Sequence, residues 1–295
     1  MTLPDKVSNI FLTGSSGFIG QRFLEYNKDK LSVRAISLIN QDINKIDFSN
    51  IDVIVHMAGK AHQMTKIDDS IYFEVNTELT KKLALAAKTN GISHFIFIST
   101  IKVFGEHQNS ILTEESKCEP IDDPYGQSKL DAELFLKSIE TPDFVVSIIR
   151  PPLVYGPGVK GNLIRFLKLA DSNKWLPFAG IDNRRTMVYL DNLIELINRI
   201  IYQKKSGIFL AADDKPMSTT FLIEEMRKSI NRPIRLFRMP TIFKLVLKKV
   251  RPELYMRLYG SLEMNPQNTF TQLNFKPPYS VEEGLREMVK GYKSI

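Results

Sequence analysis

The sequence predicts an α/β fold in which helices cover both faces of a doubly wound parallel sheet, followed by a smaller C-terminal lobe. Three observations predict it. Short apolar runs alternate with helical patterns through the first half of the 295 residues, as in parallel sheets that are buried on both faces. A glycine-rich turn follows the first apolar run. Proline and glycine then crowd residues 151–161, and the later apolar runs are shorter and more mixed.

The individual elements follow from these patterns in chain order. Strands are expected at residues 9–12, 33–38, 53–57, 94–99, 144–149 and 207–211. Helices are expected at residues 17–26, 70–89, 127–139, 162–171, 190–201, 218–230, 242–250 and 281–290. The interval from 38 to 52 is too short for a full crossover helix. We place a domain boundary at residue 160, with residues 161–295 forming a lobe that is partly interleaved with the sheet.

Composition excludes several classes of protein. An apolar fraction of 43% with 25% charged residues is that of a globular chain. Cys118 is the single cysteine, so an internal disulfide and a cysteine-based zinc site are excluded. The four histidines lack metal-ligand spacing, and we expect no metal. There is no apolar run of roughly 18 residues and no signal-peptide pattern, so we expect a cytoplasmic protein.

The net charge of +7 comes from one segment. Between Asn231 and Gly260, eight basic residues and one acid, Glu253, account for the whole excess. Because the charge is local, we expect no nucleic-acid partner. Residues 242–250 alternate apolar side chains with lysines, which permits contact with an anionic membrane or a membrane-bound protein. The alternative is a helix whose apolar face joins the core while its lysines are solvated, and we expect this second arrangement.

The glycine-rich turn predicts a dinucleotide site. Residues 13–20 read Thr-Gly-Ser-Ser-Gly-Phe-Ile-Gly at a strand–helix junction. Glycines there permit a tight turn, close approach of the backbone to a pyrophosphate and close helix–strand packing. The helix N-terminus adds free N–H groups and a positive dipole for the phosphates. Residues 1–160 are therefore predicted to be a Rossmann-type NAD(P)-binding domain.

The choice between NAD and NADP stays open at this level. The acid that usually bonds the adenosine ribose ends the second strand, and Ser37 occupies that place, with Asp42 slightly beyond. Arg34 lies nearby and could accept a 2′-phosphate, or it could equally be a solvated strand residue.

Three further residues predict acid–base chemistry. Tyr125 and Lys129 are four residues apart at a helix start, so their side chains share one face. A nearby ammonium and an oxidised nicotinamide both favour the phenolate, which brings the pKa of Tyr125 toward working pH. Thr100 follows a predicted strand, at the carboxyl edge where such sheets bind ligands. Its hydroxyl is placed to hold the substrate oxygen.

With these motifs the chain resembles the extended short-chain dehydrogenase/reductases, the NAD-dependent epimerase/dehydratase family. The resemblance covers almost the whole chain, including His56-Met57-Ala58-Gly59, the Arg150-Pro151-Pro152 segment and Arg185-Thr186. It implies that the dinucleotide is held by Gly14, Gly17, Phe18, Ile19, Gly20, Ala58, Gly59, Asn76, Ser99, Tyr125 and Lys129. It also implies that a UDP-sugar is held by Thr100, Asn162 at the nucleotide and Arg185 at the diphosphate, in a homodimer.

Departures from the family pattern narrow the reaction. Ile101 and Lys102 replace the acidic pair that 4,6-dehydratases carry after the strand-end threonine, so we do not expect a dehydratase. Cys118 stands in a polar loop and is not expected to act at C5. Leu153 replaces an asparagine that is usual in 4-epimerases.

The segments around Thr100, Tyr125 and Pro151 look most like bacterial UDP-4-keto-6-deoxy-N-acetylhexosamine reductases, which serve surface polysaccharide synthesis. We therefore expect hydride transfer at C4 of a UDP-hexose. The alternatives are a UDP-hexose 4-epimerase that retains NAD and a non-catalytic dinucleotide sensor, although a sensor has no need of all three residues Thr100, Tyr125 and Lys129.

Overall fold

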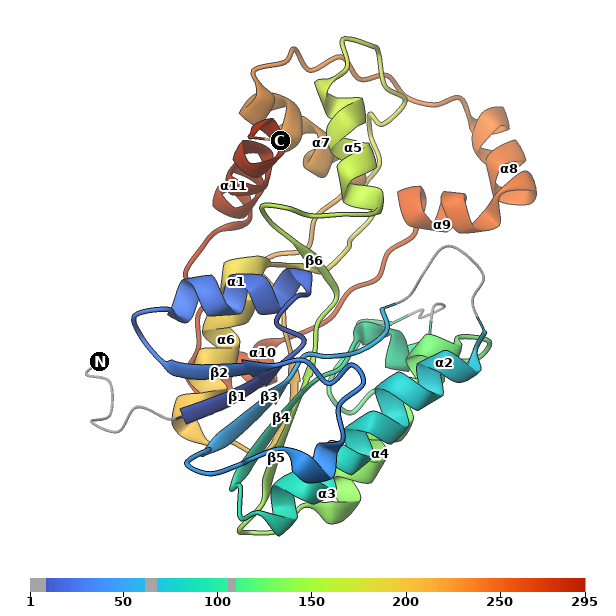
Figure 1. Cartoon of the computed structure of the whole chain (residues 1–295). Helices are drawn as coiled ribbons and strands as arrows, with labels where there is room; N and C mark the ends of the chain where they lie inside the picture. Colours follow the sequence, from blue (N-terminus) through green and yellow to red (C-terminus); the bar gives the residue numbers. More distant parts are fainter. Residues whose placement is uncertain (1–8, 62–67, 106–109, 295) are drawn as a thin grey trace. The chain divides into compact units, whose positions relative to one another are not determined.

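The computed structural model describes residues 9–61, 68–105 and 110–294 and contains a six-stranded parallel sheet. The strand order is β2-β1-β3-β4-β5-β8, and every neighbouring pair is parallel (Figure 1). The strands are β1 (Asn9–Thr13), β2 (Ser32–Ile36), β3 (Val53–His56), β4 (His94–Ile98), β5 (Val145–Arg150) and β8 (Gly207–Leu210). The order reverses after β1, as in a doubly wound sheet. The predicted fold class is confirmed.

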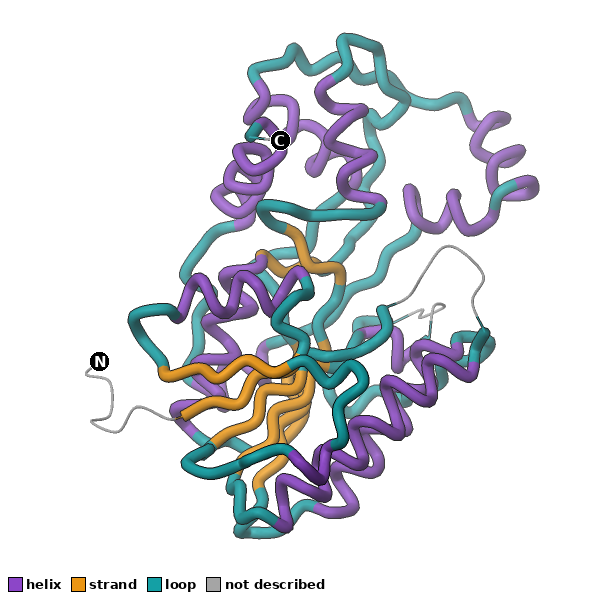
Figure 2. Tube along the Cα trace, in the orientation of Figure 1, coloured by secondary structure: helices purple, strands orange, loops and turns teal. Residues whose placement is uncertain are grey.

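Helices lie against both faces of this sheet (Figure 2). One face is covered by α1 (Phe18–Asn27) and α6 (Leu190–Gln203), which are joined by paired amide hydrogen bonds between Asn27 and Asn198. The other face is covered by α3 (Leu79–Thr89) and α4 (Pro124–Ile139). The core there is formed by strand and helix side chains that include Phe11, Ile54, Phe95, Phe97, Leu83, Ala87, Ala132 and Leu136.

Two crossovers differ from a plain helix. The short one between β2 and β3 holds only a single 3-10 turn, η1 (Ile43–Lys45), in agreement with its length. The predicted helix at 70–89 is divided into α2 (Ser70–Tyr72), a π-helical turn η2 (Phe73–Glu78) and α3. Such π turns are frequent at functional sites, and this one carries Asn76.

The chain divides into two compact units whose segments alternate along the sequence. The first unit holds the sheet and consists of Met1–Pro152, Leu193–Ala211 and Asn265–Lys276. The last of these segments contains α10 (Gln267–Leu273), whose Thr269 Oγ1 accepts a hydrogen bond from Leu210 N at the end of β8. The second unit consists of Leu153–Asn192, Ala212–Met264 and Pro277–Ile295.

The second unit is built around a small parallel pair of strands and a helical layer. The strands are β6 (Leu153–Tyr155) and β7 (Met187–Tyr189), and the helices are α5 (Asn162–Asp171), α7 (Thr219–Ile230), α8 (Thr241–Val250), α9 (Pro252–Tyr259) and α11 (Val281–Lys293). Helix α7 packs on both α5 and α11. In the core, Tyr155 Oη donates to Asp213 Oδ2 at 2.6 Å, and Asp213 Oδ1 accepts from Tyr189 N and Asn192 Nδ2. Burial raises the pKa of Asp213 to about 6.

The expected burial of the apolar face of residues 242–250 is wrong. The predicted helix forms, but none of its residues is buried. Its packing partner is the short helix α9, which it meets through another side, so the apolar side chains have no core to enter. Within the described residues, no helix is long and apolar enough to cross a membrane.

Candidate active site

The glycine turn between β1 and α1 has a shape that only glycine permits at Gly14. Gly14 has φ +75°, and a Cβ there would lie 2.5 Å from Ala58 N, in the loop after β3. Gly17 N donates to Gly14 O at 3.0 Å, which closes the turn. Gly17 is also the N-cap of α1, and no side chain caps the helix. The first N–H groups of Phe18 and Ile19 are therefore available to an anion.

A chain of buried hydrogen bonds fixes the loop after β3. Thr80 Oγ1 donates its single proton to Asn76 O, so the contact of 2.9 Å with His56 Nε2 needs the histidine as donor. His56 Nδ1 then accepts from Thr13 Oγ1 at 2.6 Å, and Thr13 in turn accepts from Ala58 N. Complete burial, with Lys129 nearby, lowers the pKa of His56 to about 3. A neutral histidine thus holds the ends of β1 and β3 in register.

Asn76 joins that loop to helix α4. Its Oδ1 accepts from Lys60 N at 2.8 Å, and its Nδ2 donates to Lys60 O and to Ser128 Oγ. A Cβ on Gly59 would lie 2.8 Å from Asn76 Oδ1 and 3.1 Å from Lys129 Nζ. The predicted dinucleotide residues Ala58, Gly59 and Asn76 therefore stand together beside Lys129, in a space too small for any side chain on Gly59.

The three predicted catalytic residues come together at the carboxyl edge of the sheet. Thr100 follows β4 and caps a 3-10 turn, where its hydroxyl accepts from Lys102 N. Tyr125 lies in the first turn of α4, which Asp123 caps through Gly126 N. The Thr100 hydroxyl is hydrogen-bonded to the Tyr125 phenol. On the other side, the Tyr125 ring packs at 5.9 Å from the ring of Tyr72 in α2.

Lys129 is buried one turn further along α4. Its Nζ donates to Ile98 O at 2.9 Å and lies 4.5 Å from the centre of the Phe97 ring. Desolvation lowers the pKa of Lys129 to about 8. Desolvation also raises the pKa of Tyr125, to about 12. The hydrogen bond from Thr100 lowers this pKa, but its effect is smaller than that of burial. In the chain alone, burial outweighs the expected effect of the ammonium on the phenol, because Lys129 is directed to the strand end.

A buried ion pair behind these residues was not predicted. Arg150, at the end of β5, binds Glu133 of α4 through Nε and Nη2, with a shortest contact of 2.6 Å. Ser99 Oγ donates to the same carboxylate. The half-buried Cys118 lies next to this pair, and burial raises the pKa of its thiol. The sequence does hold a signal, since Glu133 continues the spacing of four from Tyr125 and Lys129, and Arg150 ends an apolar strand.

The residues at the end of β2, where the adenosine ribose is expected, all have partners within the chain. Ser37 follows β2 and is exposed, and its Oγ accepts from Ile39 N. Arg34 donates to Asp47 O, and its guanidinium lies 3.8 Å from the Asp47 carboxylate. Arg34 therefore has an acidic partner within the chain. Asp42 caps the turn η1 through Asn44 N.

Two of the three residues predicted to hold a nucleotide-sugar, Asn162 and Arg185, lie in the second unit, whereas Thr100 lies in the first. Asn162 is the first residue of α5. Arg185 Nη1 donates to Met256 O and Gly260 O at the C-terminal end of α9, at 3.3 and 3.1 Å. Burial and the neighbouring Arg257 lower the pKa of Arg185. The charge of Arg257 therefore acts on Arg185 within this unit.

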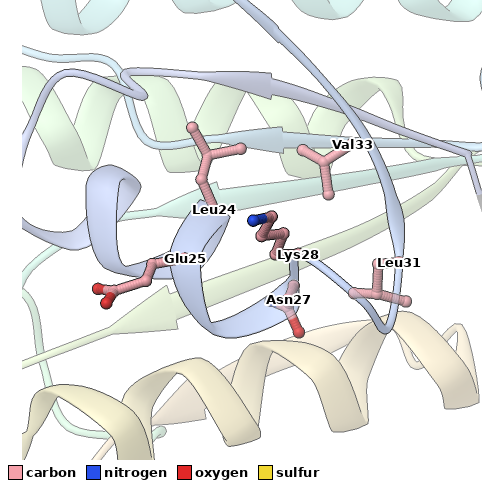
Figure 3. A pocket seen from close by; sticks show the side chains of 6 residues that line it. All are labelled: Leu24, Glu25, Asn27, Lys28, Leu31 and Val33. Carbon is pink, nitrogen blue, oxygen red and sulfur yellow. The ribbon is translucent and has the colours of Figure 1, made fainter.

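An open hollow in the first unit lies at the opposite edge from the glycine turn. Leu24, Glu25, Asn27, Lys28, Leu31 and Val33 line it (Figure 3). These residues end α1 and begin β2, whereas the turn at Gly14 precedes α1. The hollow therefore plays no part in the arrangement around Tyr125.

Metal ligation finds no support among the described residues, which contain no cluster of three His, Cys, Asp or Glu side chains that could hold an ion. His94 Nε2 pairs with Ser147 Oγ at 2.7 Å, and burial lowers the pKa of His94 to about 3. His62 and His107 lie outside the described residues.

Comparisons with known proteins identify the family of the chain. Residues 10–211 match the NAD dependent epimerase/dehydratase family. A UDP-glucose 4-epimerase of Vibrio cholerae is 32% identical, covering 96% of this chain and 95% of the relative. An N-acetyl-alpha-D-glucosaminyl-diphospho-ditrans,octacis-undecaprenol 4-epimerase of Escherichia coli O157:H7 is 26% identical over 94% of this chain and 93% of that protein.

Solved structures share the fold. One of a UDP-N-acetylglucosamine 4-epimerase from Methanobrevibacter ruminantium M1, in complex with UDP-N-acetylmuramic acid, superimposes with a TM-score of 0.80 at 23% identity. The alignment covers 98% of this chain and 99% of that one. The family match over most of the chain, with the relative of 32% identity, shows that this chain belongs to the NAD-dependent epimerase/dehydratase family of extended short-chain dehydrogenase/reductases.

Proposed function

We propose that this protein is a 4-epimerase of a UDP-hexose and that it retains its NAD between turnovers. The observation that carries the proposal is the cluster of Thr100, Tyr125 and Lys129 at the sheet edge, next to the glycine turn. The relatives support the C4 position, because both curated proteins are named as 4-epimerases of a sugar joined to a diphosphate.

We prefer the epimerase to the reductase that the sequence analysis favoured. Neither of these two relatives is named as a reductase. The ion pair of Arg34 with Asp47 also weakens the argument for a 2′-phosphate and for NADPH taken from solution. The 4-ketoreductase remains a second candidate because of Leu153, which opens β6 and is 49% exposed. An apolar side chain there offers no polar contact to a substrate.

The residues around the glycine turn fit a dinucleotide. Gly14 and Gly59 stand where a Cβ would meet backbone or polar atoms at 2.5 and 2.8 Å, so the backbone there is accessible only because these residues lack a side chain. The N–H groups of Phe18 and Ile19, in the uncapped first turn of α1, suit the pyrophosphate. We assign Lys129 and Asn76, both of which lie beside Gly59, to the nicotinamide ribose. The cofactor supplies the hydride acceptor and donor.

The chain's own groups then move one proton and orient the sugar. We assign Tyr125 as the group that removes the proton from the C4 hydroxyl when hydride leaves C4, and that returns it when hydride comes back to the other face. Thr100 holds the sugar oxygen and stabilises the phenolate. Lys129 supplies positive charge beside the phenolate once a cofactor occupies the site. Arg185, with Arg257 beside it, binds the diphosphate of the substrate.

Cofactor stoichiometry tests this proposal. The purified protein should release about one NAD per chain on denaturation and should interconvert UDP-glucose and UDP-galactose, or their N-acetylated forms, without added cofactor. A protein that carries no NAD, and that oxidises NADPH in proportion to a UDP-4-keto-sugar, would instead be the reductase. A folded protein that binds NAD but does neither would be the non-catalytic sensor. Sedimentation equilibrium tests the homodimer that we also propose.

A further inference from the structure

Helix α8 presents an apolar surface that nothing in the described chain covers. Its Ile242, Phe243, Leu245, Val246 and Val250 are between 52% and 65% exposed. In a helix, Ile242, Val246 and Val250 form one row, and Phe243 and Leu245 flank it. Soluble monomers rarely expose a contiguous apolar surface of this kind unless it contacts something.

The lysines of α8 explain why this surface faces outward. Lys244 Nζ lies 5.2 Å from the centre of the Tyr259 ring, and Lys248 Nζ lies 5.6 Å from that of Tyr255. The two tyrosine rings are stacked at 5.1 Å on α9. Lys244 and Lys248 are therefore turned toward α9, which leaves the apolar row on the side away from it. Figure 1 shows α8 and α9 as a pair set apart from α5, α7 and α11 within the second unit.

The surrounding charge favours an anionic occupant. Residues 231–260 carry the whole net charge of +7. Two of these bases have acidic partners, Arg232 with Asp171 and Arg257 with Glu253. Among the described residues, none of the three lysines of α8 forms an ion pair, and neither does Arg251.

This charge also argues against a second copy of the chain on the same surface. A self-paired interface would bring two segments of +7 together, and like charges at an interface oppose association. Nucleic acid would satisfy the lysines but would leave the apolar row in water. An anionic lipid surface satisfies both the row and the lysine beside it, because acyl chains take the apolar side chains while phosphate headgroups take Lys249 and the general positive charge of the segment.

We propose that α8 is a peripheral membrane-binding helix that lies in the interface of an anionic lipid bilayer. Ile242, Phe243, Val246 and Val250 enter the boundary between headgroups and acyl chains. Lys249 extends from the same side toward the lipid phosphates, as a long basic side chain does at such a boundary. Ten residues of helix span about 15 Å, too short to cross a bilayer. The proposal does not depend on the reaction proposed above.

Vesicle sedimentation of the full chain tests this proposal. Wild-type protein should sediment at low salt with vesicles of phosphatidylcholine that contain one-third phosphatidylglycerol, and far less with phosphatidylcholine alone. The triple variant Ile242→Gln/Phe243→Gln/Val246→Gln should lose about tenfold or more in vesicle affinity. Because all three side chains are exposed, the variant should keep its circular dichroism and melting temperature.

Two further variants control for general effects. Leu85→Gln/Ile121→Gln/Leu134→Gln removes three apolar side chains of the first unit that are 49% to 76% exposed, and it should bind vesicles as the wild type does. Lys248→Gln/Lys249→Gln/Arg251→Gln should lose about tenfold or more in affinity for the anionic vesicles and most of the salt dependence.

Either of two results would overturn the proposal. One is wild-type protein that fails to sediment with the anionic vesicles at low salt. The other is an apolar triple variant that binds them as tightly as the wild type. A wild-type dimer without vesicle binding, which the apolar triple variant converts to a monomer, would assign the surface to self-association instead.

Discussion

At the scale of single residues, Tyr125 carries the sharpest prediction. Tyr125→Phe keeps the ring that packs on Tyr72 and removes only the hydroxyl. The variant should retain its bound NAD and its melting temperature, while turnover falls by about a hundredfold or more, as expected for loss of a general acid–base group. Tyr202→Phe, on α6, is the matched control and should keep full activity. Near-normal turnover of folded Tyr125→Phe would refute the assignment.

Thr100 should affect the pH dependence more than the rate at its optimum. Its hydrogen bond favours the phenolate and lowers the pKa of Tyr125. Thr100→Val removes this stabilisation, so the pKa rises and the ascending limb of activity, where the base must be ionised, moves to higher pH. The measurement is kcat against pH for wild type and variant. An unchanged profile with reduced kcat would leave Thr100 only a role in orienting the substrate.

The site residues that could be predicted are those placed by a local pattern. Contacts between residues far apart in the sequence could not be predicted. Tyr125 and Lys129 are visible because helical periodicity places them on one face, and Thr100 because strand ends meet at one edge. The hydrogen-bonded chain from Thr13 through His56 to Thr80 joins residues that are 43 and 24 positions apart. Local patterns carry no information on such pairings, which form only when the sheet register brings the strands together.

At the scale of elements, the pair of Glu133 and Arg150 links α4 to β5 and, through Ser99, to the end of β4. Arg150→Met leaves a buried carboxylate without its partner and should cost about 3 kcal/mol of unfolding free energy. Glu133→Leu/Arg150→Met removes both charges and should cost less than the sum of the two single variants. Urea unfolding of the four proteins measures the coupling. Additive losses would show that the two charges act independently.

The predicted elements were correct where the apolar pattern was long. All six strands of the large sheet and all eight predicted helices form, with ends shifted by a few residues at most and the 70–89 helix divided. The missed strands and α-helices are β6, β7, α9 and α10, of three to eight residues. Segments this short form no complete periodic pattern. Their conformation comes from packing, as Thr269 of α10 shows by capping the end of β8.

At the scale of the whole molecule, the chain passes between its two units several times, so neither unit is made from one continuous segment. The boundary at residue 160, with a lobe partly interleaved with the sheet, stays a prediction. The sequence could not predict that the apolar side chains of α8 stay exposed. An apolar row predicts burial only if a partner surface exists, and in the second unit Tyr255 and Tyr259 of α9 meet Lys244 and Lys248 instead of the apolar row.

The shifted pKa values of three buried groups allow us to predict how the free energy of unfolding changes with pH. His56 and His94 have folded pKa values of about 3, against 6.5 in the unfolded chain. Below pH 6.5 the unfolded state therefore binds two more protons, which lowers stability by about 1.4 kcal/mol per pH unit for each histidine. Asp213 acts in the opposite direction between pH 6 and 3.8, because its folded pKa is raised to about 6 and the folded state holds the extra proton.

Between about pH 6 and 4.5, two histidines oppose one carboxyl, so stability should fall by a net of about 1.4 kcal/mol per pH unit as the pH decreases. His94→Gln should remove most of this slope, and Asp213→Asn should roughly double it, whatever either change does to the stability at pH 7. Urea unfolding at several pH values, in a single transition followed by fluorescence and circular dichroism, measures the slope. If the slope of His94→Gln equals that of the wild type, the imidazole is already protonated in the folded protein and His94 does not stay neutral against Ser147.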